Sequence, residues 1–177
     1  MRFSKLLIAA ALLTAATLAL PAFAQAPAPA REKLMMETSK GPVVIELRAD
    51  LAPKHVARIK ELTSKGFYDG LKFHRVIEGF MAQTGDPKGN GTGGSGVKLP
   101  AEISNARFTR GTVGMARAAS FDSADSQFFI CFKDCAFLNG QYTIFGTVTQ
   151  GMENVDKLAR GEPPRTPDTI VKMTVAK

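Results

Sequence analysis

Short apolar runs separated by glycine, proline and polar residues fill most of the chain after residue 33. Runs of four to eight residues that are rich in β-branched and aromatic side chains and are bounded by turn residues are typical of β-strands. Glu78 and Gly79 interrupt one of these runs. The pattern therefore predicts strands within residues 34–38, 43–47, 73–81, 112–116, 127–132, 142–148 and 170–175, the first two of which form a hairpin.

Two stretches have helical spacing of their apolar residues instead. Residues 53–64 begin with Pro53, which suits a first helical turn, and Gly66 follows as a typical residue after a helix end. Residues 152–160 form the second predicted helix, and Gly161 ends it. Many short strands with two helices indicate a mainly β protein, built as a closed antiparallel barrel with helices over its ends.

The first 24 residues differ from the rest of the chain. Arg2 and Lys5 precede an apolar stretch, and Ala22 and Ala24 flank Phe23 as a small-residue cleavage signal. The apolar stretch breaks at Pro21, short of the roughly 20 residues that span a membrane. We therefore expect a signal peptide at residues 1–24 and a periplasmic product without a membrane anchor, although an uncleaved amphipathic anchor is the alternative.

The remaining chain suits one folded domain. Residues 25–30, a glutamine followed by alternating alanine and proline, predict an extended linker, so the domain should occupy residues 31–177. Removing the leader leaves 177 − 24 = 153 residues and lowers the net charge from +7 to +5, because Arg2 and Lys5 are lost. The lysines and arginines are scattered singly, which together with export disfavours a nucleic-acid partner.

Few residues are available for metal or nucleophilic chemistry. The only histidines are His55, expected on the exposed face of the first helix, and His74. Residues 89–94 match the dinucleotide-binding pattern G-x-G-x-x-G, but the sequence after them would not begin a helix, so we expect a surface loop. The pattern predicts neither a metal site nor a cofactor.

Two cysteines lie four residues apart at Cys131 and Cys135. On an extended chain this separation is about 13 Å, well beyond the roughly 4.4 to 6.8 Å that a disulfide allows. We expect free thiols, although a sharp turn between the two residues would permit a bond in an oxidising compartment.

Residues 73–86 carry the most unusual pattern, F-H-R-V-I-E-G-F-M-A-Q-T-G-D. Arg75 lies there within an apolar, strand-forming run, where an arginine is rarely found without a partner or a task. The structural alternative is an arginine paired with an acid at the edge of the core. Three further segments follow, at residues 111–118, 126–130 and 137–146.

These four segments, in this order and spacing, closely resemble the cyclophilin family of peptidyl-prolyl cis-trans isomerases, and its exported bacterial branch in particular. The resemblance extends over about residues 34–175. It implies an eight-stranded, closed antiparallel barrel capped by two helices. It also implies catalysis of X-Pro bond rotation in proline-containing, unfolded or folding polypeptides, by a monomer that needs no cofactor.

The resemblance also assigns the site. Arg75 corresponds to the catalytic arginine, with Phe80 and Gln83 beside it. The residues that correspond to the family's peptide-binding positions are Met81, Ala116, Arg117, Gln127, Phe129, Phe137, Leu138 and Tyr142. Many eukaryotic members have Trp, His and Asn at the positions of Phe137, Tyr142 and Arg117, and we expect Arg117 to add an unscreened charge to the groove. Phe128 should face the other side of its strand.

Two other functions remain open at this point. A peptide-binding chaperone on the same barrel would retain proline peptides without turnover, and the presence of Arg75 and Gln83 counts against it. A small-molecule carrier of the lipocalin type would need a hollow barrel, whereas the Phe, Ile, Val and Met residues of this chain are sufficient to fill one.

The leader generates the first prediction. The mature chain should begin at Gln25, because Ala22 and Ala24 satisfy the small-residue requirement of leader cleavage. Mass spectrometry of the periplasmic product measures this terminus. A mature terminus beyond Arg31, or an uncleaved leader held in the membrane, would contradict the expectation.

Overall fold

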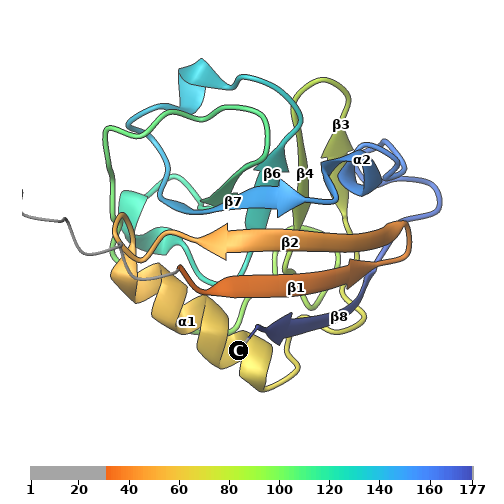
Figure 1. Cartoon of the computed structure of the whole chain (residues 1–177), viewed down its shortest axis with the longest axis horizontal. Helices are drawn as coiled ribbons and strands as arrows, with labels where there is room; N and C mark the ends of the chain where they lie inside the picture. The colour runs from red at the N-terminus through yellow and green to blue at the C-terminus, as the bar shows by residue number, and fades with distance from the viewer. Residues whose placement is uncertain (1–30, 177) are drawn as a thin grey trace, which may run out of the picture.

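The computed structural model describes residues 31–176, so the predicted leader at residues 1–24 and the linker at 25–30 lie outside the described residues. The described chain contains eight strands and two α-helices, joined by turns and loops (Figure 1). The strands are β1 (Lys33–Thr38), β2 (Gly41–Leu47), β3 (Arg75–Ile77), β4 (Met81–Thr84), β5 (Thr112–Met115), β6 (Phe128–Cys131), β7 (Ile144–Gln150) and β8 (Ile170–Val175). Each predicted strand is present, and the run at 73–81 divides at Glu78 and Gly79 into β3 and the start of β4.

The strands form one antiparallel sheet in the order β3-β4-β6-β5-β7-β2-β1-β8. The expectation of a closed barrel is wrong, because β3 and β8 are edge strands that do not pair with each other. The contact between the two edges is short and precedes β3: Lys72 bridges Thr169, and backbone hydrogen bonds join Ile170 to Gly70 and Leu71. The chain leaves this part of the sheet in turns rather than continuing the ladder, so the sheet curls into a half-barrel (Figure 1).

The first helix, α1 (Pro53–Ser64), has the predicted bounds. Gly66 follows it at φ +69°, a conformation that glycine adopts without a steric penalty. The second helix, α2 (Met152–Val155), is shorter than the predicted 152–160. The helical ladder ends because the amides of Lys157 and Leu158 donate to carbonyls three residues back, and the next amide, of Ala159, donates to the carboxylate of Asp168.

The sheet separates two apolar cores, since side chains alternate between its faces. The larger core lies inside the half-barrel and includes Phe128 and residues of both helices. The smaller core lies on the opposite face and centres on Phe129. As predicted, Phe128 and Phe129 therefore face opposite sides of β6, and the smaller core supports the predicted site.

The expectation of a solvated His55 is wrong, because its side chain is completely buried. Its Nδ1 lies 2.7 Å from Oε2 of Glu102, whose carboxylate also accepts the amides of Lys54 and His55 at the start of α1. Burial opposes ionisation of Glu102, but these hydrogen bonds hold its pKa below the ordinary value. An acid from a distant loop therefore caps a helix that has no side-chain cap of its own.

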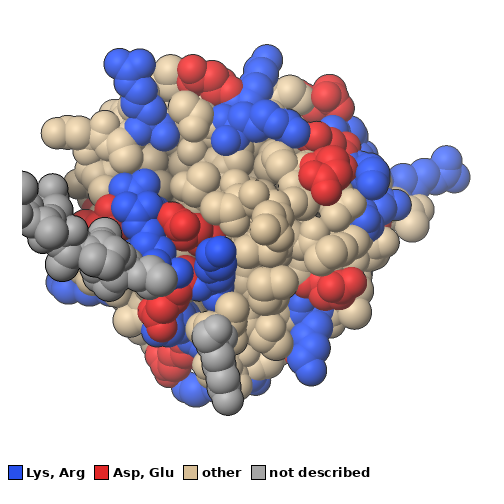
Figure 2. All heavy atoms as spheres, in the orientation of Figure 1, with Lys and Arg blue, Asp and Glu red and all other residues tan. Residues whose placement is uncertain are grey.

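Charged side chains of both signs are interspersed on the face drawn in Figure 2, around a broad uncharged area. Among the described residues, no helix has the length and hydropathy that crossing a membrane requires. Within residues 31–176, no three His, Cys, Asp or Glu side chains gather in a way that would hold a metal ion.

The buried His74 generates a prediction for stability. Burial lowers its pKa below the ordinary value, and the nearby charge of Asp86 only partly opposes this effect. Because the unfolded chain then binds a proton more readily than the folded one, the free energy of unfolding should be highest above about pH 6.5 and fall as the pH decreases toward 5. Urea unfolding at several pH values measures this slope.

The variant His74→Gln serves as the control for this prediction, because glutamine does not titrate. Its free energy of unfolding should vary less between pH 8 and 5 than that of the parent. A parent protein whose stability is flat over this interval would contradict the prediction.

Candidate active site

The predicted site is built as one row of residues across four neighbouring strands. The strand register places Arg75 of β3 opposite Gln83 of β4, Gln83 opposite Phe129 of β6, and Phe129 opposite Gly114 of β5. Paired residues in an antiparallel sheet point to the same face. Positions more than fifty residues apart in sequence therefore meet on the outer face of the half-barrel.

A cavity of about 110 Å³ opens over this row. It is lined by Arg75, Phe80, Met81, Gln83, Ala116, Arg117, Phe129, Leu138 and Tyr142. All nine residues belong to the predicted site. The other two predicted residues lie beside the cavity: Gln127 lines a neighbouring one, and Phe137 packs against Phe80 with ring centroids 5.2 Å apart.

The floor of the cavity is buried and rigid. Phe129 is stacked on Phe108, with centroids 5.7 Å apart, and meets the ring of Tyr142 edge-on at the same distance. Gly114 makes room for this stack, because a Cβ there would lie 2.7 Å from ring atoms of both Phe108 and Phe129. A pocket with an aromatic floor of fixed shape suits a small apolar ring.

A chain of polar contacts runs along one wall. Nε of Arg75 donates to Oε2 of Glu162 at 3.0 Å, and its Nη1 lies 3.5 Å from Oε1 of Gln83. Nε2 of Gln83 donates to Oε1 of Gln127 at 2.9 Å. These contacts fix side-chain orientations and leave Arg75 at the cavity as a hydrogen-bond donor.

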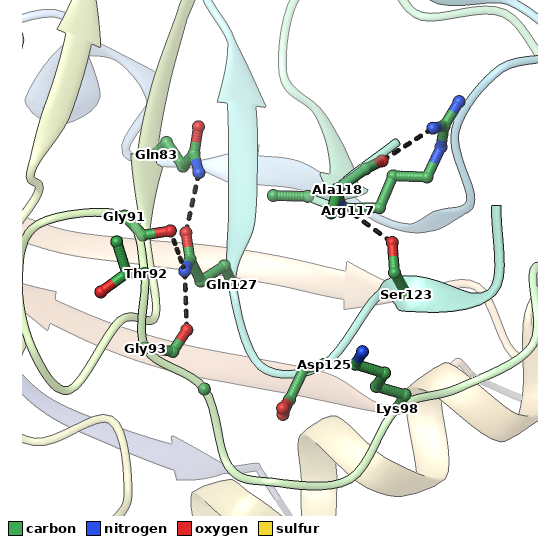
Figure 3. A pocket seen from close by; sticks show the side chains of 12 residues that line it. Gln83, Gly91, Thr92, Gly93, Lys98, Arg117, Ala118, Ser123, Asp125 and Gln127 are labelled. Atoms are coloured by element: carbon green, nitrogen blue, oxygen red, sulfur yellow. Dashed lines mark hydrogen bonds between the residues drawn. The ribbon is translucent and has the colours of Figure 1, made fainter. Parts of the chain in front are cut away.

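A second cavity, of about 280 Å³, adjoins the first (Figure 3). The two share Gln83, Ala116 and Arg117, so together they form one groove. Residues 91–94 of the glycine-rich loop form its opposite wall, and Nε2 of Gln127 donates to the carbonyls of Gly91 and Gly93. The loop is not followed by a helix, as predicted, and it lines the groove.

Two carboxylates hold this loop in place. Asp86 accepts the amides of Lys88, Asn90 and Gly91, and these bonds lower its pKa although burial opposes ionisation. Asp125 accepts the amides of Ser95 and Gly96. Figure 3 shows the Asp125 carboxylate directed away from the amine of Lys98. The loop therefore forms a fixed wall.

Arg117 is held more tightly than we expected from the sequence. Its guanidinium donates to the carbonyls of Gln141, Ala118 and Ala119 and lies over the rings of Phe121 and Tyr142, 4.2 and 4.7 Å from their centroids. Within the described part of the chain it forms no ion pair. Its charge is thus unpaired, as expected, but its position is fixed.

Both cysteines are free and buried in the smaller core, next to Met81 and Leu138. Burial raises the pKa of the Cys131 thiol, and its contact with Cys135 acts in the same direction. A thiol with a raised pKa is a poor nucleophile at neutral pH, so Cys131 is a packing residue of the smaller core.

The sequence did not indicate three residues that shape the site. Phe108 and Gly114 determine how Phe129 lies, and Glu162 contacts Arg75. Gly114 belongs to the segment 111–118, which the sequence did single out. Its role became clear only from the strand register, which places it opposite Phe129. Glu162 is 87 residues from Arg75 and belongs to none of the four segments, so no local pattern could have identified it.

Comparison with known proteins finds relatives over most of this chain. Residues 33–175 match the family model described as cyclophilin type peptidyl-prolyl cis-trans isomerase/CLD. A relative from Brucella suis, a probable peptidyl-prolyl cis-trans isomerase, is 52% identical over 80% of this chain and 81% of its own length. Peptidyl-prolyl cis-trans isomerase B of Bacillus subtilis is 43% identical over 68% of this chain and 85% of its own.

Solved cyclophilin structures share the fold. A cyclophilin type isomerase of Cryptosporidium parvum, determined in the presence of the dipeptide Ala-Pro, superimposes with a TM-score of 0.77 at 29% identity. That comparison covers 82% of this chain and 99% of the other. The cyclophilin AquaCyp293 of Hirschia baltica gives a TM-score of 0.74 at 27% identity, covering 80% of this chain and 73% of the other.

The aromatic floor generates a prediction. Gly114→Ala should raise the KM for a proline peptide, because the new methyl group displaces the ring of Phe129, and should destabilise the fold by about 1 to 3 kcal/mol. Isomerisation kinetics and thermal unfolding measure the two effects. Gly146→Ala is a matched control, since its Cβ would crowd Ile45 in the larger core at 2.8 Å. Equal KM values in both variants would contradict the role given to Gly114.

Proposed function

The chain belongs to the cyclophilin-type peptidyl-prolyl cis-trans isomerase family, and we propose that it accelerates X-Pro rotation in exported proteins with an apolar proline pocket and an arginine donor. One observation carries the mechanism: Arg75 lies on the wall of a cavity whose floor is Phe129, Met81 and Leu138. The Cryptosporidium parvum structure, determined in the presence of Ala-Pro, supports a proline-containing peptide as the occupant.

The reaction requires no covalent step in this proposal. An X-Pro bond rotates through a twisted amide that has lost its resonance, over a barrier of about 18 to 20 kcal/mol. The aromatic floor would hold the pyrrolidine ring while the preceding carbonyl swings. Arg75 would donate to the prolyl side of the bond, including the nitrogen lone pair that resonance no longer occupies, and so stabilise the twisted state over the planar ones.

The size of the rate acceleration requires both the arginine donor and the apolar pocket. Raising a spontaneous rate of about 10⁻² s⁻¹ to about 10³ s⁻¹ takes five decades, or about 7 kcal/mol. One transition-state donor contributes about 2.7 to 4 kcal/mol. The rest must come from fixing the ring and excluding water, for which the buried floor of Met81 and Phe129 is suited.

The groove beyond the cavity would hold the residues that precede proline. Ala116 and Arg117 line both cavities, and Gln127 lines the second one. Phe137, which is exposed beside Phe80, would cover the rim of the proline pocket. A monomer suffices in this proposal, because one chain provides both cavities.

The cellular setting is also a proposal. The leader pattern at residues 1–24 supports delivery to the periplasm, where the clients would be newly exported, still unfolded polypeptides. No membrane attachment or nucleic-acid partner is needed for this role.

The second function considered, a chaperone that retains proline peptides, predicts binding without turnover. The contact of Arg75 with the proline cavity favours turnover over simple retention, because a charged donor adds little to the binding of an apolar ring. An isomerisation assay on the mature chain separates the two, since a retaining protein would bind the peptide without accelerating exchange.

The arginine generates the main prediction. Arg75→Ala should reduce kcat/KM by about two to three decades, as expected for one lost transition-state donor, with a much smaller loss of peptide affinity. Arg75→Lys should recover little, because a single ammonium cannot contact Glu162, Gln83 and the substrate as a planar guanidinium does. Kinetics with a proline tetrapeptide measure both variants.

Two comparisons make this prediction specific. Arg48→Ala removes an arginine that is also partly exposed and paired with a carboxylate, that of Asp50, but lies outside both cavities, and it should leave the rate unchanged. Phe129→Ala should weaken peptide binding as well as turnover, because ground and transition states both use the ring pocket. An Arg75→Ala protein that is folded and retains the parent's kcat/KM would move the chemistry to the pocket alone.

A further inference from the structure

The ion pair between Arg75 and Glu162 places a carboxylate directly behind the proposed donor. Oε2 of Glu162 lies 3.0 Å from Nε of Arg75, while the opposite end of the guanidinium faces Gln83. Glu162 does not line the proline cavity. Glu162 can therefore act on a bound substrate only through its effect on Arg75.

The fold places Glu162 there by strand pairing. Gly161 and Val76 exchange two backbone hydrogen bonds of 2.8 Å, in an antiparallel bridge on the free edge of β3. In this register the residue after Gly161 lies opposite the residue before Val76. Glu162 and Arg75 are therefore cross-strand neighbours whose side chains share a face.

The turn that begins at Gly161 helps to hold Glu162 beside Arg75. Gly161 adopts φ +146°, and a Cβ there would lie 2.6 Å from Cα of Pro164 and 2.8 Å from the carbonyl oxygen of Pro163. The chain thus folds back on itself directly after pairing with β3. This keeps Glu162 beside Arg75 although its side chain is about half exposed.

An arginine on an edge strand needs such support. The Arg75 side chain is 41% exposed, and a long side chain in that position populates many rotamers. Glu162 and Gln83 contact the guanidinium from two sides. Together they restrict its plane at the position where Arg75 lines the cavity.

We propose that Glu162 is a positioning residue for the isomerase reaction, which holds the Arg75 guanidinium through Nε in the orientation that donates to the twisted prolyl bond. This inference rests on the proposed function of Arg75. Glu162 touches neither the proline cavity nor its floor, so its effect is on the rate and not on peptide binding.

The test uses a double-mutant cycle on the mature chain. Glu162→Ala should lower kcat/KM about fivefold, the upper range for a partly exposed ion pair, mainly through kcat and with little change in KM. Glu162→Gln should recover most of the loss, because its amide oxygen still accepts from Nε. In an Arg75→Ala background, Glu162→Ala should have no further effect.

Glu78→Ala is the matched control. Glu78 pairs with Nε of Arg160 at 2.6 Å in the neighbouring turn and lines neither cavity. This variant should keep the parent's kcat/KM. Thermal unfolding of all variants separates a rate effect from a loss of folded protein.

A second measurement reports on position without catalysis. The ¹H–¹⁵N signal of the Arg75 Nε–H group should shift and exchange faster with water in Glu162→Ala, but not in Glu78→Ala. An unchanged signal, an unchanged kcat/KM in folded Glu162→Ala, or an equal loss in the Arg75→Ala background would each overturn the inference.

The outcome for Arg75→Ala distinguishes this inference from the proposed function. If Arg75→Ala is slow and Glu162→Ala is not, only the positioning role fails. If Arg75→Ala retains full kcat/KM, the arginine mechanism fails, and the positioning role of Glu162 in the reaction fails with it.

Discussion

The register of four antiparallel strands determines whether this protein has a site at all. Arg75, Gln83, Phe129 and Gly114 lie on one face only because β3, β4, β6 and β5 pair without a shift along that row. A slip of one residue would exchange the two faces and direct Phe129 into the larger core. The buried residues of that core therefore fix the catalytic row as well as the fold.

The sequence predicts the elements well because their signals are local. The first helix and the strand positions follow from periodicity and from bounding residues such as Pro53 and Gly66. The residues around the cavity could be assigned from the four sequence segments that resemble the family, because each residue lies within one of these segments. What the sequence could not predict depends on distant partners: Glu102 pairs with the buried His55, and Asp168 accepts the amide of Ala159 just beyond the second helix. A closed barrel was expected because strand number does not reveal whether the edge strands meet.

The site combines two kinds of rigidity. Its floor is apolar and tightly packed, so that even a methyl group at Gly114 has no room. Its walls are polar, and they are fixed by hydrogen bonds from Gln127 and by the carboxylates of Asp86 and Asp125. A reaction that breaks no covalent bond depends on holding one ring still while a neighbouring group moves. A fixed floor and fixed walls meet this requirement better than a groove that closes around its substrate.

The open edge of the sheet also contributes to the site. In a closed barrel, β3 would pair with β8 along its length, and the outer edge of β3 would have no free backbone groups. Because the sheet stays open, Val76 exchanges hydrogen bonds with Gly161 instead. That bridge places the side chain of Glu162 next to Arg75. In a closed barrel, a residue of β8 would occupy this place. The feature that makes the fold a half-barrel therefore also lets a segment 87 residues away contact the proposed donor.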